Sequence, residues 1–329
     1  MEFKNALFIN FGGIGDEILF FPVLDSFKKK FPNSKITLAL EPRSKSAKEL
    51  TLLMDDVMCV DIKGKNKYFN ILKFIFSVWQ KKFDIVISSG KSPFIAIILF
   101  LTGIKTKIGY KTKTSFLLTH SQELNENQYA AKMYHDLLKP LGILDYENPK
   151  IKTEPVDFDF PKDYVAIHPG VSKMSVQKNI IKCPKIDFWI NLIKGILLKN
   201  KPVVLLGGPD DEKLISEITK NEEILKNSNF VNFYMKTKNI SQMAEVMKNA
   251  NCVICADSAP LHCAVAVSSC VFAIFGPTNE EKLTPKSKNV TIVKNDLKCR
   301  PCLWHKRQMN CENSECLNID YNLILDKIN

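Results

Sequence analysis

Two distant segments of the chain share one arrangement, in which a hydrophobic strand leads through a short turn into a helix with an acidic residue at its start. The first consists of residues 6–10 followed by 11–16, and the second of residues 252–256 followed by 257–262. Turns of this kind direct backbone N–H groups and a helix N-terminus toward a ligand, which favours anions and especially phosphates. One such site near each end of the chain predicts two domains that face a shared cleft.

Strand and helix patterns alternate along the rest of the chain. Before residue 150, strands are expected at residues 7–10, 35–40 and 83–88, and helices at 17–31, 46–54 and 68–82. After it, strands are expected at 164–168, 203–207, 230–233, 252–256 and 270–275, and helices at 187–198, 210–219 and 240–249. This rhythm is typical of parallel sheets flanked by helices, which bind ligands at the carboxyl ends of their strands. We therefore expect an α/β protein with two doubly wound Rossmann-like domains.

The pattern lapses between Asn148 and Asp163, where prolines recur and no helical period is visible. A chain of 329 residues exceeds what one hydrophobic core usually supports, so a second domain is expected on length alone. We place the domain boundary in this segment, with one domain at residues 1–155 and the other at 156–329.

The net charge of +11 comes almost entirely from lysine, since arginine occurs only at Arg43, Arg300 and Arg307. Lysine meets phosphate as a flexible point charge and lacks the bidentate fork with which arginine reads bases. We expect anionic substrates or an anionic membrane surface as partners, and no nucleic acid. The alternative is a lysine-rich solvated surface.

The N-terminal residues run directly into a strand, with no apolar stretch of the kind that precedes a secretory cleavage site. The apolar run at residues 94–101 is far shorter than the roughly 20 residues of a membrane-spanning helix, and it predicts a buried helix. Ten cysteines without an export signal indicate reduced thiols. A cytoplasmic location is therefore expected.

Four motifs in order resemble those of glycosyltransferase family 9, the ADP-heptose:lipopolysaccharide heptosyltransferases and their relatives. They are Gly12–Asp16 with Pro22 six residues on, Leu205–Pro209, Asp257–His262 and Phe275–Thr278. The resemblance covers nearly the whole chain. It implies a GT-B fold and a metal-independent, inverting transfer of heptose from a nucleotide diphosphate, with no cofactor. The implied donor is ADP-heptose, and the implied acceptor is a lipid-linked saccharide of the lipopolysaccharide inner core.

In the first domain the resemblance implies that Gly12, Gly13 and Gly15 bring the acceptor sugar close to Asp16. Asp16 would then be the general base, because an attacking hydroxyl must lose its proton and a carboxylate within reach can accept it. The alternative is that Asp16 only caps the helix that follows the glycine turn.

In the second domain the resemblance implies that the donor diphosphate is held at a helix N-terminus. The residues assigned to the diphosphate are Asp257, Ser258, Ala259 and His262. His168 and Gly170 are assigned to the donor nucleotide in general. Family members more often have Gly where Ala259 stands, so the turn there is expected to differ slightly. The alternative is that Asp257 caps the helix and His262 is a buried, satisfied histidine.

Family members commonly carry a basic residue two positions before a Trp-Pro pair, where it neutralises the departing diphosphate. Here Cys183 replaces the Trp and Ile181 occupies the basic position. Lys182 and Lys178 are the candidates to supply the charge instead, since a long lysine stem absorbs a shift of one residue. Alternatively they are solvated loop lysines, as we expect for Lys173.

Two further groups of residues are assigned by their place in the family pattern. Gly207 and Gly208 are expected near the ribose or base of the nucleotide, or else form an ordinary strand-to-helix connection. Lys105 and Lys107, in a basic stretch that continues to Lys113, are expected to attract a charged acceptor or an anionic leaflet, or else to be solvated.

The cysteine-bearing tail also resembles that of many family members. Cys299, Cys302, Cys311 and Cys316 have a spacing that fits a zinc site, a disulfide pair or packed thiols, and we assign no metal to them. Cys252 and Cys255 would point to opposite faces of a strand and are interpreted as core residues.

Taken together, these features predict a cytoplasmic glycosyltransferase of the heptosyltransferase kind, peripheral to the inner face of the inner membrane. One alternative is another GT-B transferase or an epimerase that uses a different nucleotide-sugar. A second alternative is a catalytically silent sugar-nucleotide binding module, which would tolerate Asp16→Asn with its ligand affinity intact.

Overall fold

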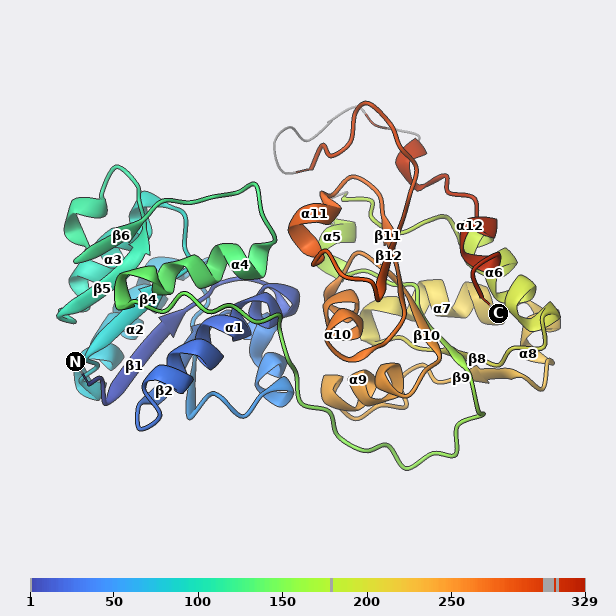
Figure 1. The fold of residues 1–329 in the computed structure, drawn as a ribbon, viewed down its shortest axis with the longest axis horizontal. Coiled ribbons are helices and arrows are strands. Elements are labelled where there is room, and N and C mark those ends of the chain that lie inside the picture. Colours follow the sequence, from blue (N-terminus) through green and yellow to red (C-terminus); the bar gives the residue numbers. More distant parts are fainter. Residues whose placement is uncertain (1, 178–179, 304–310, 312–313, 329) are drawn as a thin grey trace. The chain divides into compact units, whose positions relative to one another are not determined.

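The computed structural model of the chain describes residues 2–177, 180–303, 311 and 314–328. The chain divides into two compact units, Met1–Lys152 and Thr153–Asn329. The division falls three residues before the boundary that the sequence predicts. Each unit contains one parallel six-stranded sheet with helices on both of its faces (Figure 1).

The first unit has the strand order β3-β2-β1-β4-β5-β6. Its strands are β1 (Asn5–Ile9), β2 (Lys35–Leu40), β3 (Asp56–Cys59), β4 (Ile85–Ser88), β5 (Thr106–Tyr110) and β6 (His120–Gln122). Its helices are α1 (Ile14–Lys30), α2 (Lys67–Lys81), α3 (Pro93–Leu101) and α4 (Ala130–His135), with 3-10 turns η1 (Pro42–Leu50), η2 (Ser115–Leu117) and η3 (Asp136–Leu141). The strand order reverses between β1 and β4, so the loops that follow these two strands border the crevice where such sheets bind ligands.

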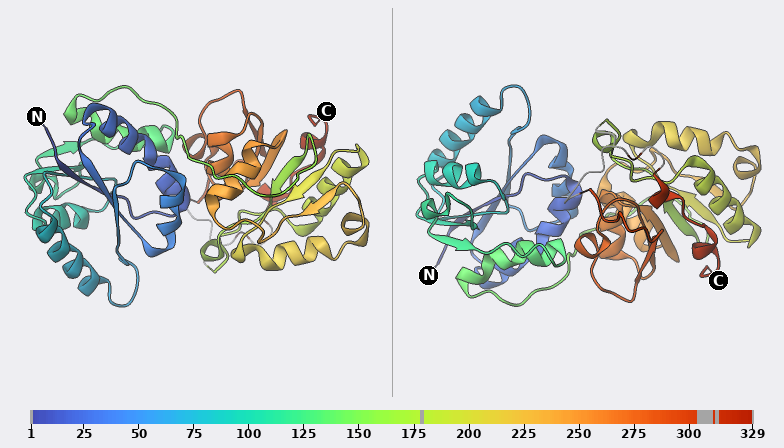
Figure 2. Two further views of the ribbon diagram at one scale, coloured as in Figure 1. Left: turned by 90° about the horizontal axis from the view of Figure 1, so that it is seen from below. Right: turned by 90° about the horizontal axis from the view of Figure 1, so that it is seen from above.

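Strand β1 shows how the sequence builds both faces of this sheet. Phe8 packs edge-on against Phe20 and Phe27 of α1. Leu7 and Ile9 point the other way, into a core that they share with the buried residues of α2 and α3. Helices α1 and α4 therefore cover one face of the sheet, and α2 and α3 cover the other (Figure 2).

The second unit repeats the topology, with the order β12-β11-β10-β7-β8-β9. Its strands are β7 (Val165–His168), β8 (Val203–Leu205), β9 (Phe230–Asn232), β10 (Cys252–Ala256), β11 (Val271–Phe275) and β12 (Val290–Lys294). Its helices are α5 (Lys173–Gln177), α6 (Ile186–Leu198), α7 (Glu212–Thr219), α8 (Glu222–Leu225), α9 (Ile240–Lys248), α10 (Ala259–Val267), α11 (Glu280–Leu283) and α12 (Asn322–Leu325), with 3-10 turns η4 (Pro209–Asp211) and η5 (Glu315–Leu317). Here the order reverses between β7 and β10.

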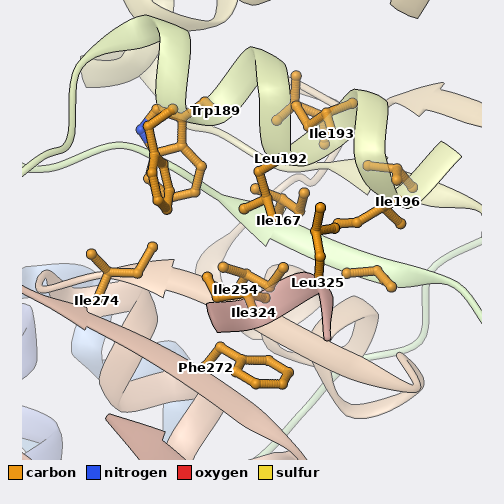
Figure 3. Close-up of a cluster of buried hydrophobic side chains, with 14 of the residues drawn as sticks. Ile167, Trp189, Leu192, Ile193, Ile196, Ile254, Phe272, Ile274, Ile324 and Leu325 are labelled. Atoms are coloured by element: carbon orange, nitrogen blue, oxygen red, sulfur yellow. The ribbon is translucent and has the colours of Figure 1, made fainter. Parts of the chain in front are cut away.

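The core of the second unit lies between its sheet and α6. Trp189 and Leu192 of α6 face Ile167 of β7 and Ile254 of β10 (Figure 3). Leu325 of α12, near the C-terminus of the chain, belongs to the same cluster. Cys252 and Cys255 are buried in β10, which confirms their interpretation as core residues.

Two expectations about helices were wrong. The segment predicted as a helix at 46–54 is instead the 3-10 turn η1, which begins earlier, at Pro42, where proline fixes the first helical φ. The apolar run at 94–101 does form α3, but only one side of it is buried. Phe94, Phe100 and Leu101 are 43%, 53% and 47% exposed. Among the described residues, none of the helices has the length and apolar character needed to cross a membrane.

Candidate active site

In the first unit, Asp16 folds back over the glycine turn that follows β1. Gly13 is the N-cap of α1, and its N–H donates to Asp16 Oδ2 at 2.8 Å. A Cβ on Gly12 would lie 2.3 Å from the Asp16 Cβ, so only glycine leaves room for this carboxylate. Gly13, by contrast, has no atom closer than 3.6 Å to such a Cβ. Asp16 is thus not the N-cap itself, and its part in the helix start uses one oxygen.

The second oxygen of Asp16 faces a tyrosine. The Tyr134 hydroxyl donates to Asp16 Oδ1 at 3.5 Å. Burial raises the pKa of Tyr134 well above 10, and the neighbouring Asp16 charge raises it further, so the hydroxyl stays protonated and can donate. Asp16 as a whole is partly exposed, so its side chain is not closed off from solvent.

A group of buried polar side chains holds the backbone of Asp16 in place. Asn10, at the end of β1, donates through Nδ2 to the Asp16 carbonyl at 3.2 Å and to Glu17 Oε2 at 3.0 Å. The Ser89 hydroxyl, from the loop after β4, donates to Asn10 Oδ1. Glu17 is fully buried, and burial raises its pKa well above the usual value. This group was missed in the sequence, where Glu17 is one acidic residue in an apolar helix.

A cation borders the same turn. A Cβ on Gly13 would lie 3.6 Å from Arg43 Nη1, so the guanidinium faces the turn. Arg43 Nε donates to Glu41 Oε2 at 2.7 Å, and the Ser44 hydroxyl donates to the Gly12 carbonyl at 2.7 Å. Sequence reasoning assigned Arg43 no role. A single arginine after β2 carries no motif that would have revealed it.

The lysines assigned to the acceptor lie elsewhere in the sheet. Lys105 precedes β5 and Lys107 is near its start, whereas Gly12 and Asp16 follow the carboxyl end of β1. Because the strands are parallel, these two groups lie at opposite edges of the sheet. Lys107 Nζ also donates to the Ile104 carbonyl at 2.7 Å. The structure therefore does not bring Lys105 and Lys107 to Asp16.

In the second unit, Lys182 and Asp257 form an ion pair at the N-terminus of α10. Lys182 Nζ lies 3.0 Å from Asp257 Oδ2 and 3.5 Å from the Asp257 carbonyl. The Asp257 side chain is 2% exposed and that of Lys182 is 18% exposed. The cation is thus held at a buried anion while part of it remains open to solvent.

The first turn of α10 has no side-chain cap. Its N-cap is Ser258, whose hydroxyl donates to the Gly170 carbonyl at 3.1 Å and to the Ala256 carbonyl at 3.3 Å, so it does not accept from the helix. Asp257 does not cap the helix either, since the N-cap is the next residue. Ala259 begins the helix and His262 is buried within it. An uncapped helix N-terminus beside an ammonium group suits an anion.

A second polar group lies at the ends of β7 and β8. Asp211 Oδ2 accepts from the Gly208 N–H at 2.7 Å and lies 3.6 Å from His168 Nε2. A Cβ on Gly170 would lie 1.6 Å from Asp211 Oδ1, so this glycine makes room for the carboxylate. Burial lowers the pKa of His168. Gly207 packs against Ile215. The structure thus brings together His168, Gly170 and Gly208 around Asp211, which sequence reasoning had not singled out.

The loop after β11 fixes Asp257 from the other side. The buried Thr278 hydroxyl donates to Asp257 Oδ2 at 2.6 Å. Arg300 holds the same loop, since its Nε donates to the Gly276 carbonyl at 2.5 Å and its Nη2 to Glu280 Oε2 at 3.1 Å. The role of Arg300 was also missed, because these contacts join residues 20 and 24 positions apart in the sequence.

In the loop before α6, Cys183 stands where the family pattern has a tryptophan. Cys183 Sγ donates to the Pro169 carbonyl at 3.1 Å and accepts from Trp189 Nε1 at 3.4 Å. Ile181 and Lys173 are exposed, as expected for Lys173. Lys178, the other candidate cation, lies outside the described residues. Lys182 is therefore the loop lysine that the structure places at α10.

The four tail cysteines interact with one another but form no bonded site. Burial raises the pKa of Cys316 to about 11, and the nearby thiols of Cys311, Cys302 and Cys299 raise it further. All ten cysteines of the chain lie in the described part and are free thiols. Within the described ranges, no group of three or more His, Cys, Asp or Glu residues is arranged to hold a metal ion.

Comparisons with known proteins agree with this architecture. The model of glycosyltransferase family 9 (heptosyltransferase) matches residues 71–312. Lipopolysaccharide heptosyltransferase 3 of Escherichia coli K12 is 24% identical over 300 residues, which cover 84% of this chain and 83% of that protein.

Solved structures show the same fold. ADP-heptose lipopolysaccharide heptosyltransferase II of E. coli has a TM-score of 0.76 at 14% identity, covering 98% of this chain and 97% of that one. The iron-containing dodecameric glycosyltransferase TibC of enterotoxigenic E. coli has a TM-score of 0.60 at 12% identity, covering 99% of this chain and 78% of that one. At these identities the likeness establishes the two-domain GT-B fold.

Proposed function

Because the chain belongs to glycosyltransferase family 9, we propose that it transfers a heptose from ADP-heptose to a saccharide acceptor of the lipopolysaccharide inner core, with inversion at the transferred carbon. The observation that carries the proposal is the arrangement of Asp16. One carboxylate oxygen is fixed by the glycine turn, and the other faces a partly open position beside a protonated tyrosine.

Asp16 acts as the general base in this proposal. An acceptor hydroxyl attacks the anomeric carbon of the donor and gives its proton to Asp16, while the bond from that carbon to the diphosphate oxygen breaks and ADP leaves. Attack from the face opposite the leaving group inverts the anomeric configuration. The turn formed by Gly12, Gly13 and Gly15 holds the acceptor, and Arg43 adds a positive charge beside it.

Lys182 and the N-terminus of α10 stabilise the charge that develops on the departing diphosphate. The ammonium group and the uncapped backbone N–H groups are fixed before the reaction, which is the condition under which such groups lower a barrier most. Asp257, Thr278 and Arg300 position Lys182 and the loop beside it. His168 and Asp211, with Gly207 and Gly208, border the ribose or base of the nucleotide.

No metal takes part in the proposed transfer, since a lysine and a helix N-terminus supply the positive charge that a metal would otherwise provide. Iron is named for TibC, whereas this scheme assigns no role in the reaction to the tail cysteines of this chain. Retention of activity in the presence of a chelator tests this part of the proposal.

The two units have separate roles in this scheme. Residues 1–155 bind the acceptor and residues 156–329 bind the donor. A lipid-linked acceptor also places the enzyme on the inner face of the inner membrane as a peripheral protein, with an anionic leaflet as its partner.

The test is ADP release from ADP-heptose, with and without heptose-deficient lipopolysaccharide, for the wild type and Asp16→Asn. We expect release that depends on the acceptor and falls by at least about a hundredfold in the variant, with ADP affinity unchanged. ADP binding without release with any acceptor would exclude heptosyl transfer and favour a binding module. Turnover of a different nucleotide-sugar without an acceptor would favour an epimerase.

A further inference from the structure

The outer surface of α2 and α3 is an unpartnered aromatic face, and we propose that it docks the protein onto an anionic lipid bilayer. This proposal deepens the peripheral membrane association proposed above by naming the surface that makes it. We define the aromatic face by Tyr68, Leu72, Phe76 and Trp79 of α2 with Phe94 and Phe100 of α3, which are between 43% and 65% exposed. Both helices cover one face of the first sheet (Figures 1 and 2).

The exposed aromatic side chains are concentrated on this surface, whereas the exposed aliphatic side chains elsewhere are scattered singly. Among the described residues eight aromatic side chains are exposed, and seven of them lie on α2, α3 or the adjoining η2. Helix α2 has two apolar sides. Ile71, Phe74 and Val78 are buried against the sheet, whereas Tyr68, Leu72 and Phe76 follow one another every four residues on the solvent side. A large contiguous apolar surface of this kind marks an interaction site.

The charge around the aromatic face matches an anionic partner. Residues 62–122 contain eleven lysines and one acidic residue, so this stretch holds +10 of the chain's net charge of +11. The carboxylate of the one acidic residue, Asp84, accepts hydrogen bonds from the backbone N–H groups of Lys4 and Asn5. Such lysines each contribute on the order of 1 kcal/mol of attraction near an anionic leaflet. Apolar residues inside a lysine border fit a lipid surface better than a protein partner.

Several of these lysines are available to lipid headgroups. Lys73 and Lys82 are exposed on and just after α2, and Lys105 is exposed after α3. The ion pairs of the described residues do not include these three side chains, although other lysines nearby, such as Lys111 with Glu123, are paired. The free lysines thus border the aromatic face itself.

The geometry suits binding in the plane of the interface. Helix α2 has 15 residues, and its exposed stripe from Tyr68 to Trp79 runs about 17 Å along the surface. The Trp79 indole donates to the Leu101 carbonyl at 3.0 Å, which ties the ends of α2 and α3 together and fixes the ring at the surface. Trp and Tyr are the residues that prefer the headgroup level, with one polar end wet and the ring in the apolar layer.

The aromatic face reaches the proposed acceptor turn. A cavity of about 200 Å³ opens between the first turns of α2 and α3 and is lined by Tyr68, Ile71, Phe94 and Phe11. Phe11 immediately precedes Gly12, which packs against Asp16. Docking through this face would therefore bring the glycine turn to the surface that carries a lipid-linked acceptor.

The test is flotation of the full chain with vesicles of phosphatidylethanolamine and phosphatidylglycerol, compared with phosphatidylcholine alone, at low and high salt and without donor or acceptor. We expect binding to the anionic vesicles that weakens with salt. Phe76→Ser combined with Phe100→Ser should lower this binding by about tenfold or more. The matched control is Leu52→Ser combined with Leu144→Ser, two exposed leucines of the same unit outside the face, which should bind like the wild type.

Three outcomes would overturn the proposal. They are no flotation of the wild type, unchanged flotation of the Phe76→Ser/Phe100→Ser variant, or a dimer in light scattering that this variant converts to monomer, since a second copy would then cover the face. Transfer to a delipidated, water-soluble acceptor should be unchanged in the variant. Because vesicle binding is measured without turnover, failure of the docking proposal and failure of heptosyl transfer give different results.

Discussion

The Lys182 ammonium lies 3.0 Å from the carboxylate of Asp257, and the carboxylate is the more deeply buried of the two. A buried carboxylate needs partners, and among the described residues Lys182 and the Thr278 hydroxyl are partners of Asp257. The lysine, being partly exposed, can exchange some of its interaction with Asp257 for one with a diphosphate. The pair thus places a positive charge at the start of α10 before any ligand arrives.

We predict that Lys182→Ala weakens donor use. Loss of a fixed charge at a developing anion typically costs about a hundredfold or more in kcat/KM. Lys182→Arg should restore part of the activity because the charge returns. The control is Lys173→Ala, in an exposed lysine at the start of α5, which should keep kcat/KM within about twofold.

Steady-state kinetics with ADP-heptose would check this prediction, together with thermal unfolding of each variant. Equal losses in Lys182→Ala and Lys173→Ala would show that the loop contributes only general positive charge. A loss of folding without a change in the kinetics of the remaining folded protein would show that Lys182 serves Asp257 alone.

A pair of adjacent glycines gives a sharp test of the turn before Asp16. In Gly12→Ala the new Cβ would meet the Asp16 Cβ at 2.3 Å, so the carboxylate must move. In Gly13→Ala the nearest atom is 3.6 Å away, an ordinary contact. We expect Gly12→Ala to lose most transfer activity while retaining ADP binding, and Gly13→Ala to remain active. Activity assays with calorimetric ADP titration distinguish them, and similar activity in both would place the base elsewhere.

The second unit offers a similar comparison. A Cβ on Gly170 would lie 1.6 Å from Asp211 Oδ1, whereas a Cβ on Gly208 would have Asp211 Oδ2 at 3.9 Å. Gly170→Ala should displace the carboxylate, release its bond to the Gly208 N–H and lower the free energy of unfolding by about 1–3 kcal/mol. Gly208→Ala should change it by less than about 1 kcal/mol. Urea unfolding would measure the free energy of unfolding of both variants. Equal losses in the two would mean that the segment around Gly170 shifts to accommodate the new Cβ.

The regular part of this fold was predictable from sequence because it depends on local patterns. The apolar strands β1, β7 and β10 and the turns that follow them are continuous segments with a clear period, and the assignments of Gly12 and Asp257 depended on those turns. The family motifs then supplied an order for them. The alternation of strand and helix also predicts that the strands run parallel, but it does not indicate that β1 pairs with β4 or β7 with β10.

The misses have a common physical cause, which is contact between residues distant in sequence. Arg300 bonds to Gly276, and nothing in either segment indicates the other. Lys105 belongs to the expected basic stretch, yet the direction of β5 places it at the edge of the sheet away from Asp16. Phe100 lies in an apolar run that looks buried, and only the packing of α3 on the sheet shows which side is exposed.

We predict that Thr278 acts through Asp257. Thr278→Val keeps the shape but removes the hydroxyl that donates to Asp257 Oδ2 at 2.6 Å. A buried carboxylate that loses a donor should lower the free energy of unfolding by about 1–3 kcal/mol. Thr278→Ser keeps the hydroxyl and should cost less. Denaturant unfolding of the two variants provides the measurement, and equal costs would mean that the methyl group lost in Thr278→Ser contributes as much as the hydroxyl lost in Thr278→Val.

The last prediction concerns pH and the buried Glu17. Burial raises the pKa of Glu17 in the folded state well above its ordinary value of 4.5, so in the window above about pH 4.5 the folded chain binds more protons than the unfolded chain. Stability must then fall as the pH rises through this window. Glu17→Gln removes the titrating group and keeps an oxygen that can accept from Asn10. The variant should therefore match the wild type near pH 4.5 and be more stable than the wild type at pH 8.

Glu147 provides a control of opposite sign. It is exposed, and Lys150 beside it lowers its pKa to about 2. The stability from this carboxylate is present above its unfolded pKa and is lost as the pH falls, so Glu147→Gln should differ from the wild type most at pH 8 and be the less stable protein there. Urea unfolding of the wild type and both variants at several pH values would check these signs. Parallel curves for wild type and Glu17→Gln would mean that Glu17 is ionised in the folded protein, with its carboxylate stabilised by the hydrogen bond from the Asn10 amide.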